Sequence, residues 1–301
     1  MNEKPAEHIP VLAQTLLENI SLPRDAVMVD ATIGHGGHSL LFAQQLGPEG
    51  LIIGLDVDQN SIDRARSVLG QVNCRVKLVR ENFSGVKAVL ADQGVDKIDF
   101  LLADLGFCSA QLEDESKGLS FQKNMPLDMR LDNRLGTSAA DIVNRMDEKS
   151  LADLIYQFGE DHASRRIARF IVHQRKAGPI VTTEHLAAIV CKALGQAPTG
   201  RKYKIHPATR TFQALRIAVN SELENLQELL ETATDVLDTG GRIAVISFHS
   251  LEDKLVKNDF KSKALRGIYK VLTKKPLVAT EQEKIDNPRS RSAKLRIAER
   301  L

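Results

Sequence analysis

The sequence predicts an α/β fold in which a parallel sheet is interrupted by an inserted helical domain. Three observations predict it. Short apolar runs alternate with helical stretches through the first hundred residues, which is typical of parallel strands joined by crossover helices. The alternation stops near Glu113 and resumes only after Gly241. The chain has 301 residues, a length near which one hydrophobic core commonly divides into two.

The first half supplies four strands in order, preceded by an amphipathic helical stretch from Pro10 to Ile20. We expect a helix after the second strand, over about residues 59–69. The strands are expected at 26–34, 51–58, 76–82 and 98–106. These runs are continuously apolar, so both faces of the sheet should be covered, and its ligand should bind at the carboxyl ends of the strands.

The middle of the chain is helical by its apolar spacing, and the sheet returns late. We expect amphipathic helices at about 151–158, 163–171 and 186–194, and one long helix from His206 to Leu230. Strand-like runs at 242–250, 267–273 and 293–298 complete seven strands. The predicted domains are therefore 1–112 with 213–301, which form the sheet, and 113–212, which form the helical insert.

Composition excludes several classes of protein. The chain is 43% apolar and 27% charged, as in ordinary globular proteins. No apolar run reaches the ~18 residues of a membrane span, and the N-terminus lacks the pattern of a signal peptide. Cys74, Cys108 and Cys191 form no C-x-x-C pair, so we expect reduced thiols. A cytoplasmic protein without membrane contact is predicted. No spacing of His, Asp or Glu resembles a metal site, so no essential metal is expected.

Positive charge is clustered along the chain although the formal net charge is only +2. Between Arg165 and Arg216 lie eleven Lys or Arg residues and one acid, Glu184. A second, weaker basic segment runs from Lys254 to Lys275. Such clustering predicts a polyanionic partner, with a solvated surface as the alternative. The predicted contacts to that partner are Arg165, Arg166, Arg169, Arg201, Lys202, Lys204 and Arg210.

A glycine-rich turn, DATIGHGGHS over residues 30–39, follows the first strand. Turns without Cβ atoms let the backbone approach a ligand closely. It is not a dinucleotide fingerprint, because Ser39 stands where G-x-G-x-x-G requires glycine. Asp56, twenty residues beyond Gly36, ends the second strand, where a carboxylate can accept hydrogen bonds from ribose hydroxyls. The alternative is a helix cap, a role that Asp58 could equally fill.

Two further strand ends carry candidate residues. Asp104 ends the fourth strand, and an acid there is costly unless it binds a polar group. Phe83 follows the third strand and could pack against an adenine ring, although an isolated Phe more often belongs to the core.

Taken together, these residues resemble a bacterial methyltransferase family that methylates the exocyclic N4 of a cytidine in small-subunit (16S) ribosomal RNA. The resemblance spans nearly the whole chain and keeps the blocks in order. The matching blocks are 30–39, 104–106, 111–112, 118–121, 126–130, 156–160, 206–214, 247–253 and 287–291.

The resemblance implies a class I methyltransferase sheet of Rossmann-like form, with S-adenosylmethionine as cofactor and 16S rRNA of the small subunit, in its decoding-centre region, as substrate. The family usually reads Leu-Gly-Val-Ser-Ser-Pro-Gln after the aspartate of the fourth strand. Phe107, Cys108 and Ala110 depart from that pattern, which bears on the shape of the target pocket. The residues implied to contact the cofactor are Gly36, Gly37, His38, Asp56, Phe83, Asp104 and Gln111.

Methyl transfer to an amino group depends mainly on positioning the nucleophile about 3–3.5 Å from the methyl carbon. We expect Asp104, or the carbonyls of Leu105 and Gly106, to accept hydrogen bonds from the N4 hydrogens while Phe107 stacks on the base. If Asp104 instead binds the methionine amino group, its direct catalytic role disappears. His249, on the same rim, could contact the cytosine, or cap a helix.

Asp128 and His206 could also contact the target nucleotide. Three other functions compete with this prediction. A dinucleotide oxidoreductase would leave the basic insert unexplained. A non-catalytic RNA-binding assembly factor would have no use for Gly36, Gly37 and Asp56. A methyltransferase acting on DNA or protein differs only in its acceptor, and here the resemblance alone favours RNA.

Overall fold

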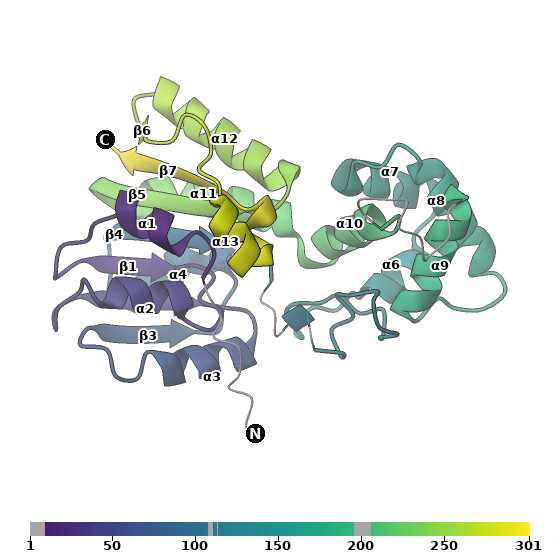
Figure 1. The fold of residues 1–301 in the computed structure, drawn as a ribbon, viewed down its shortest axis with the longest axis horizontal. Coiled ribbons are helices and arrows are strands. Elements are labelled where there is room, and N and C mark those ends of the chain that lie inside the picture. The colour runs from purple at the N-terminus through teal and green to yellow at the C-terminus, as the bar shows by residue number, and fades with distance from the viewer. Residues whose placement is uncertain (1–9, 108–110, 113, 196–205) are drawn as a thin grey trace. The chain divides into compact units, whose positions relative to one another are not determined.

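The computed structural model describes residues 10–107, 111–112, 114–195 and 206–301, and its two compact units appear in Figure 1. The first unit comprises Met1–Gly106 and Leu223–Leu301, and the second comprises Phe107–Glu222. These divisions lie six and ten residues from the predicted boundaries at 112/113 and 212/213. Among the described residues, no helix is long and apolar enough to cross a membrane.

The first unit is built on a sheet of seven strands in the order β3-β2-β1-β4-β5-β7-β6. The strands occupy the predicted regions of the chain, with tighter bounds in the first half. They are β1 (Val27–Asp30), β2 (Leu51–Leu55), β3 (Arg75–Val79), β4 (Ile98–Asp104), β5 (Leu237–Ser247), β6 (Tyr269–Val271) and β7 (Lys294–Arg300).

The sheet is mixed, because β7 runs antiparallel to both β5 and β6. The first residue of β7, Lys294, pairs with the last residue of β5, Ser247. The chain therefore enters β7 at the carboxyl end of β5 and must run back along it. Strands β3, β2, β1, β4 and β5 remain parallel.

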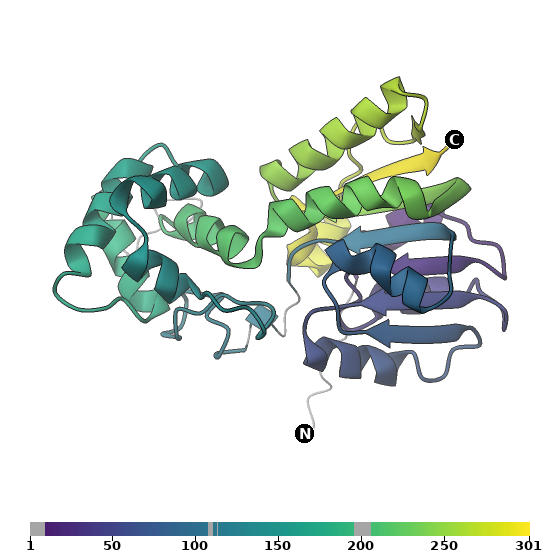
Figure 2. The same ribbon diagram turned by 180° about the vertical axis from the view of Figure 1, so that it is seen from behind.

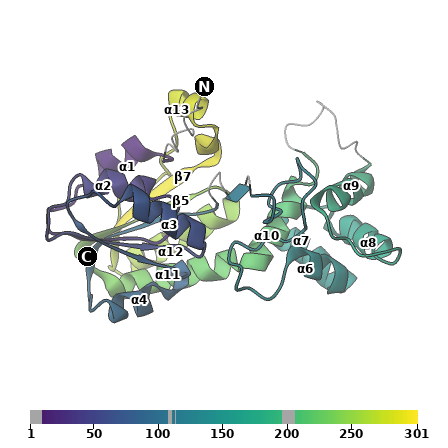
Figure 3. The ribbon, with the colours of Figure 1, turned by 90° about the horizontal axis from the view of Figure 1, so that it is seen from below.

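Helices cover both faces of the sheet, as the continuous apolar strands predict (Figure 3). On one face, Met28, Phe100 and Ala244 pack with residues of α1 (Ala13–Asn19) and α2 (Gly37–Ala43). On the other, Val29 and Leu101 pack with α4 (Val86–Asp92), α11 (Glu222–Val236) and α12 (Ser250–Leu265). Figure 2, from behind, shows α4 and α11 over the strands. Residues one apart on a strand thus face opposite cores.

Four further helical elements are found in the described part of the first unit. Helix α3 (Gln59–Val68) follows β2, as expected. Helix α13 (Glu281–Asp286) and the 3-10 turn η2 (Pro288–Ser292) lie between β6 and β7. The 3-10 turn η1 (Phe83–Gly85) joins β3 to α4.

The second unit has its own core, formed by α6 (Ala139–Arg145), α7 (Glu148–Gly159), α8 (Ser164–Gln174), α9 (Thr183–Leu194) and α10 (Thr209–Asn220). Helices α7 and α10 approach closely at Gly159, where a Cβ would lie 2.6 Å from the carbonyl oxygen of Arg210. Only glycine permits that approach, which also secures α10 to this unit.

The predicted long helix from His206 to Leu230 is instead two helices, α10 and α11, separated at Ser221. Ser221 adopts the left-handed conformation, with φ of 49°. Asn220, at the end of α10, donates to the carbonyl of Met129 and accepts from the amide of Leu131. These bonds hold α10 within the helical unit. The helix ends at Asn220, and α11 begins at Glu222.

Candidate functional site

The candidate site of the first unit is formed where β1, β2 and β4 end together. Asp30, the last residue of β1, pairs with Gly54 of β2 and with Leu102 of β4. Beyond the strands, the amide of Ile33 donates to the carbonyl of Leu55 over 2.8 Å. The loops after these three strands therefore lie side by side at one edge of the sheet, where the sequence predicted the ligand.

The glycine-rich turn has the backbone conformation that its composition indicates. Gly34 and Gly36 have φ values of 50° and 83°, in the left-handed region that glycine tolerates best. A Cβ at Gly36 would lie 3.4 Å from the Cα of Ala65, so the turn is also closely packed against α3. At Gly37 a Cβ would lie 2.8 Å from Pro10. The turn is thus fixed before any ligand arrives.

Asp56 holds this turn against the loop after β2. Its Oδ2 accepts a hydrogen bond from the amide of Gly34 at 3.0 Å, and its Oδ1 accepts one from the amide of Asp58 at 2.8 Å. Desolvation by the surrounding protein raises the pKa of Asp56 to about 6. Asp58, and not Asp56, caps the following helix, because its carboxylate accepts a hydrogen bond from the amide of Asn60 at the start of α3.

Asp104 and His38 form the second part of the site. The Nε2 atom of His38 lies 3.4 Å from Oδ2 of Asp104, and the His38 side chain is buried. Within the described chain, neither ring nitrogen of His38 nor Oδ1 of Asp104 has a hydrogen-bond partner. Buried polar atoms are rarely left unpaired, so this pair has the capacity to bind a polar ligand.

Asp30, which the sequence argument did not single out, lies beneath this pair. It is 1% exposed, and its Oδ2 accepts from the hydroxyl of Ser39 at 2.7 Å. Burial raises its pKa, while the hydrogen bond from Ser39 and the charge of His38 act in the opposite direction. The signal was present in the sequence, because Asp30 ends a buried strand just as Asp104 does.

The remaining candidates of the first unit are placed as follows. Phe83 begins η1, and its partly exposed ring packs on the core of the first unit. The residue before it, Asn82, caps this turn, because its carboxamide oxygen accepts a hydrogen bond from the amide of Ser84.

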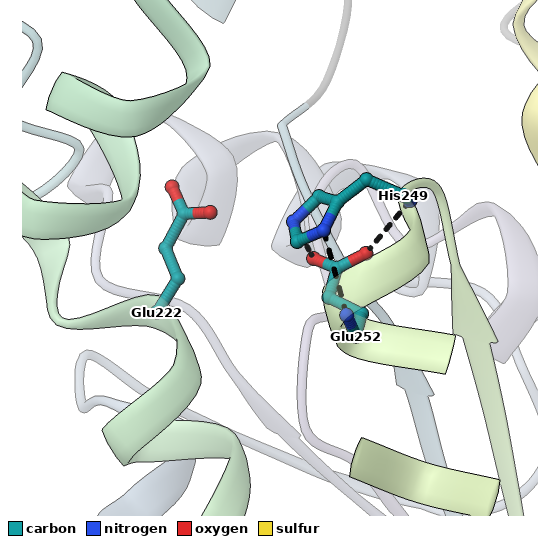
Figure 4. A group of neighbouring side chains, drawn as sticks. All are labelled: Glu222, His249 and Glu252. Carbon is teal, nitrogen blue, oxygen red and sulfur yellow. Dashed lines mark hydrogen bonds and ion pairs between the residues drawn. The ribbon is translucent and has the colours of Figure 1, made fainter. Parts of the chain in front are cut away.

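His249 is the N-cap of α12. Its Nδ1 accepts a hydrogen bond from the amide of Glu252, and its Nε2 lies 3.1 Å from the Glu252 carboxylate. Figure 4 shows this pair, with Glu222 drawn at the start of α11. Glu222 accepts two hydrogen bonds from Arg216.

Phe107 and Gln111 belong to the second unit. The guanidinium of Arg216 lies 4.8 Å from the centre of the Phe107 ring, and Gln111 is buried.

Asp128, another candidate, accepts hydrogen bonds from Arg130, which hold the pKa of Asp128 below the usual value. His206 stacks on Phe121 with ring centres 4.5 Å apart. Cys108 and Ala110 lie outside the described residues.

The basic block of the second unit divides into two groups. Arg165, Arg166 and Arg169 are exposed on α8, and Arg169 lies 3.8 Å from Glu148. Arg175 and Arg210 instead donate to backbone carbonyls, the former to Val143 and Met146 and the latter to Glu160. Arg201, Lys202 and Lys204 lie outside the described residues.

Comparison with known proteins places the chain among methylases. A family model described as the MraW methylase family matches residues 5–301. A protein of Acidobacterium capsulatum named ribosomal RNA small subunit methyltransferase H is 46% identical over 300 residues, covering 97% of this chain and 98% of its own. Proteins of the same name from Acaryochloris marina and Clostridioides difficile are 47% and 43% identical. They cover 98% of this chain, and 94% and 99% of their own lengths.

Proposed function

Because the chain belongs to the MraW methylase family, we propose that it transfers a methyl group from S-adenosylmethionine to the exocyclic N4 of a cytidine in 16S rRNA of the small ribosomal subunit, in the decoding-centre region. The observation that carries the proposal is the unpartnered His38 and Asp104 pair beside the fixed glycine turn and Asp56. The printed names of the relatives support small-subunit rRNA as the substrate. The choice of N4 is the finer part of the proposal.

The site fits this cofactor by charge. S-adenosylmethionine carries a sulfonium and an ammonium group, and the sulfonium supplies a methyl group that is readily displaced. Asp30 and Asp104 end β1 and β4, and Asp56 directly follows β2. Burial raises the pKa of Asp30 and of Asp56; the charge of Asp104 adds to the rise at Asp30, and the charge of Asp30 adds to the rise at Asp56. A cation bound among these carboxylates would relieve that repulsion.

Each cofactor contact has a residue suited to it. Asp56 accepts from the ribose hydroxyls with the lone pairs that its two backbone donors leave available. Asp104 binds the methionine ammonium through Oδ1, with His38 beside it. Gly36 and Gly37 bring the backbone close to the cofactor, while Phe83 packs on the adenine and Gln111 adds a polar contact.

With Asp104 bound to the ammonium, the chain acts on the cytidine mainly by positioning. The carbonyls of Leu105 and Gly106 accept from the N4 hydrogens, which favours a pyramidal amino group whose lone pair faces the methyl carbon. Gly106 is exposed, with φ of 100°, so its peptide is presented at the end of β4. Phe107 stacks on the base, whereas His249 has the helix-cap role, with both ring nitrogens directed at Glu252.

The RNA itself is bound through phosphate contacts. Arg165, Arg166 and Arg169 are exposed on α8. The sequence also nominates Arg201, Lys202, Lys204 and Arg210 as phosphate contacts. Arginine guanidinium groups suit phosphate because they present paired donors in one plane. These contacts would anchor the RNA strand by its phosphates, while the target cytidine is turned out of the strand and held by stacking.

The test is transfer of isotopically labelled methyl from S-adenosylmethionine to small ribosomal subunits isolated from a strain lacking this protein. The RNA is digested to nucleosides and analysed by mass spectrometry. Labelled N4-methylcytidine is the expected product. A label on another nucleoside would retain the rRNA methyltransferase and refute N4 specificity. Cofactor binding without labelled RNA would refute the RNA acceptor, and no cofactor binding would favour an RNA-binding assembly factor.

A further inference from the structure

A row of lysines on α12, in the first unit, forms a basic surface that the site described above does not use. Lys254, Lys257 and Lys261 are all exposed. Their spacing of three and four residues places them on one side of the helix, over about 10 Å of its axis at 1.5 Å per residue. We call these three residues the lysine row. The opposite side of α12 carries the buried Val256 and Phe260, which pack on the sheet.

The acidic residues of α12 do not neutralise the lysine row, because each has other partners. Glu252 accepts from the amide of Phe248 and closes the capping box of the helix. Asp253 accepts from Arg296 at 2.6 Å and also lies near Lys294. Asp259 lies 3.0 Å from the buried Lys263.

The lysine row itself makes no ion pair with any carboxylate in the part of the chain that the structure describes. Arg266, Lys274 and Lys275, which follow α12, are exposed as well and add to the same sign of charge. The acids of α12 are thus engaged by partners other than the lysine row, while the lysines of the row are exposed. This arrangement concentrates positive electrostatic potential on one side of the helix.

We infer that the lysine row is a second RNA-binding surface, located on the sheet-containing unit, which contacts phosphates of the rRNA outside the target nucleotide. This inference rests on the proposed function, which supplies an RNA partner. Lysine side chains act as flexible point charges, so they suit phosphate contacts without reading base sequence. The row therefore contributes affinity and salt dependence, while the chemistry depends on the site at the ends of β1, β2 and β4.

The test compares two triple variants with the wild type. Lys254→Gln, Lys257→Gln and Lys261→Gln together remove the row. The matched control, Lys77→Gln, Lys87→Gln and Lys97→Gln, removes the same charge from lysines at β3 and around α4, where Lys87 pairs with Asp235. Binding to small ribosomal subunits is measured by filter retention from 50 to 200 mM salt, and S-adenosylmethionine binding is measured by equilibrium dialysis.

The row variant is expected to bind about tenfold more weakly at the lower salt, with a slope of log K against log salt smaller by about 2, since each lost phosphate contact lowers the slope by roughly 0.7 to 0.9. The control variant should match the wild type, and cofactor binding should be equal in all three. A row variant with wild-type affinity and slope would overturn the inference.

Two further outcomes separate this inference from the proposed function. If the wild type binds subunits but produces no labelled N4-methylcytidine, the proposed function fails while the salt slopes still decide the role of the row. If the row variant binds subunits normally but loses retention on phosphatidylglycerol vesicles that the wild type shows, the surface binds lipid and the inference is wrong.

Discussion

At the scale of single residues, Asp104 is the side chain whose role is most sharply testable. Asp104→Asn removes the charge that we assign to the methionine ammonium, and a lost charged hydrogen bond corresponds to about 10- to 100-fold in affinity. We expect cofactor affinity to fall by that factor in equilibrium dialysis, while Asp238→Asn, an exposed acid before the buried part of β5, has no effect. Retained affinity with abolished turnover would instead assign Asp104 to the chemistry.

Asp56 predicts two opposite dependences on pH, because its pKa is raised to about 6 in the folded protein. Its contribution to stability is complete below 3.8, the ordinary pKa of an aspartate in the unfolded chain, and is lost as pH rises through about 6. Cofactor affinity should change in the other direction, rising over the same window as the carboxylate ionises. Urea midpoints and dialysis between pH 4 and 8 measure the two trends. Both should flatten in Asp56→Asn, and a wild-type affinity independent of pH would contradict the assignment.

At the scale of elements, the turn between β1 and α2 should be sensitive to a single methyl group. Gly36→Ala places a side chain at φ of 83° and brings Cβ within 3.4 Å of Ala65. Left-handed backbone costs a non-glycine residue about 1–2 kcal/mol. Gly94→Ala is a matched control, with φ of 67° and no atom within 4 Å of the added Cβ. Both variants should lose similar unfolding free energy, but only Gly36→Ala should weaken cofactor binding in dialysis. Equal affinities in the two variants would count against a cofactor role for the turn.

Elements also mark where sequence reasoning succeeded and where it failed. Continuous apolar runs such as Leu51–Leu55 identified the central strands, because burial on two faces leaves a local pattern. The edge strands β3 and β6 are partly exposed and are only weakly marked by such runs. An apolar run carries no direction, however, so the antiparallel β7 could not be foreseen. The break at Ser221 was equally hidden, since it depends on hydrogen bonds from Asn220 to Met129 and Leu131 rather than on a local glycine or proline.

The same distinction applies to the candidate site. The turn was predicted because glycines cluster after a strand. Asp56 and Asp104 were predicted because a carboxylate at the end of a buried strand is costly unless it binds a polar group. Which arginines of the basic block also donate hydrogen bonds within the protein could not be read from the sequence. Arg175 and Arg210 bond to carbonyls about 30 and 50 residues away, and no spacing in the sequence signals such partners.

At the scale of the whole molecule, the exposed arginines of α8 should contribute to RNA affinity but not to cofactor affinity. Arg165→Gln, Arg166→Gln and Arg169→Gln together should weaken binding to small subunits across all salt concentrations and lower the salt slope by about 2. Cofactor affinity should stay unchanged, because none of these three arginines is among the proposed cofactor contacts. The control changes Lys123, Arg145 and Lys149, exposed residues already paired with carboxylates, to Gln. If both triple variants weaken RNA binding equally, only net charge matters and the α8 surface is not specific.

The placement of the helical unit between β4 and β5 also sets an order of events during synthesis. Strand β4 pairs with β5, yet residues 105–236 are translated between them, which takes roughly 7 to 26 seconds at typical rates. Throughout that interval the edge of β4 has no neighbour on that side, and open strand edges invite pairing with other chains. The helical unit, with its own core, emerges completely before β5 does. The nascent chain therefore carries a folded helical domain and an incomplete sheet at the same time. We expect chaperones that bind nascent chains to cover the open edge of β4 until β5 is synthesised.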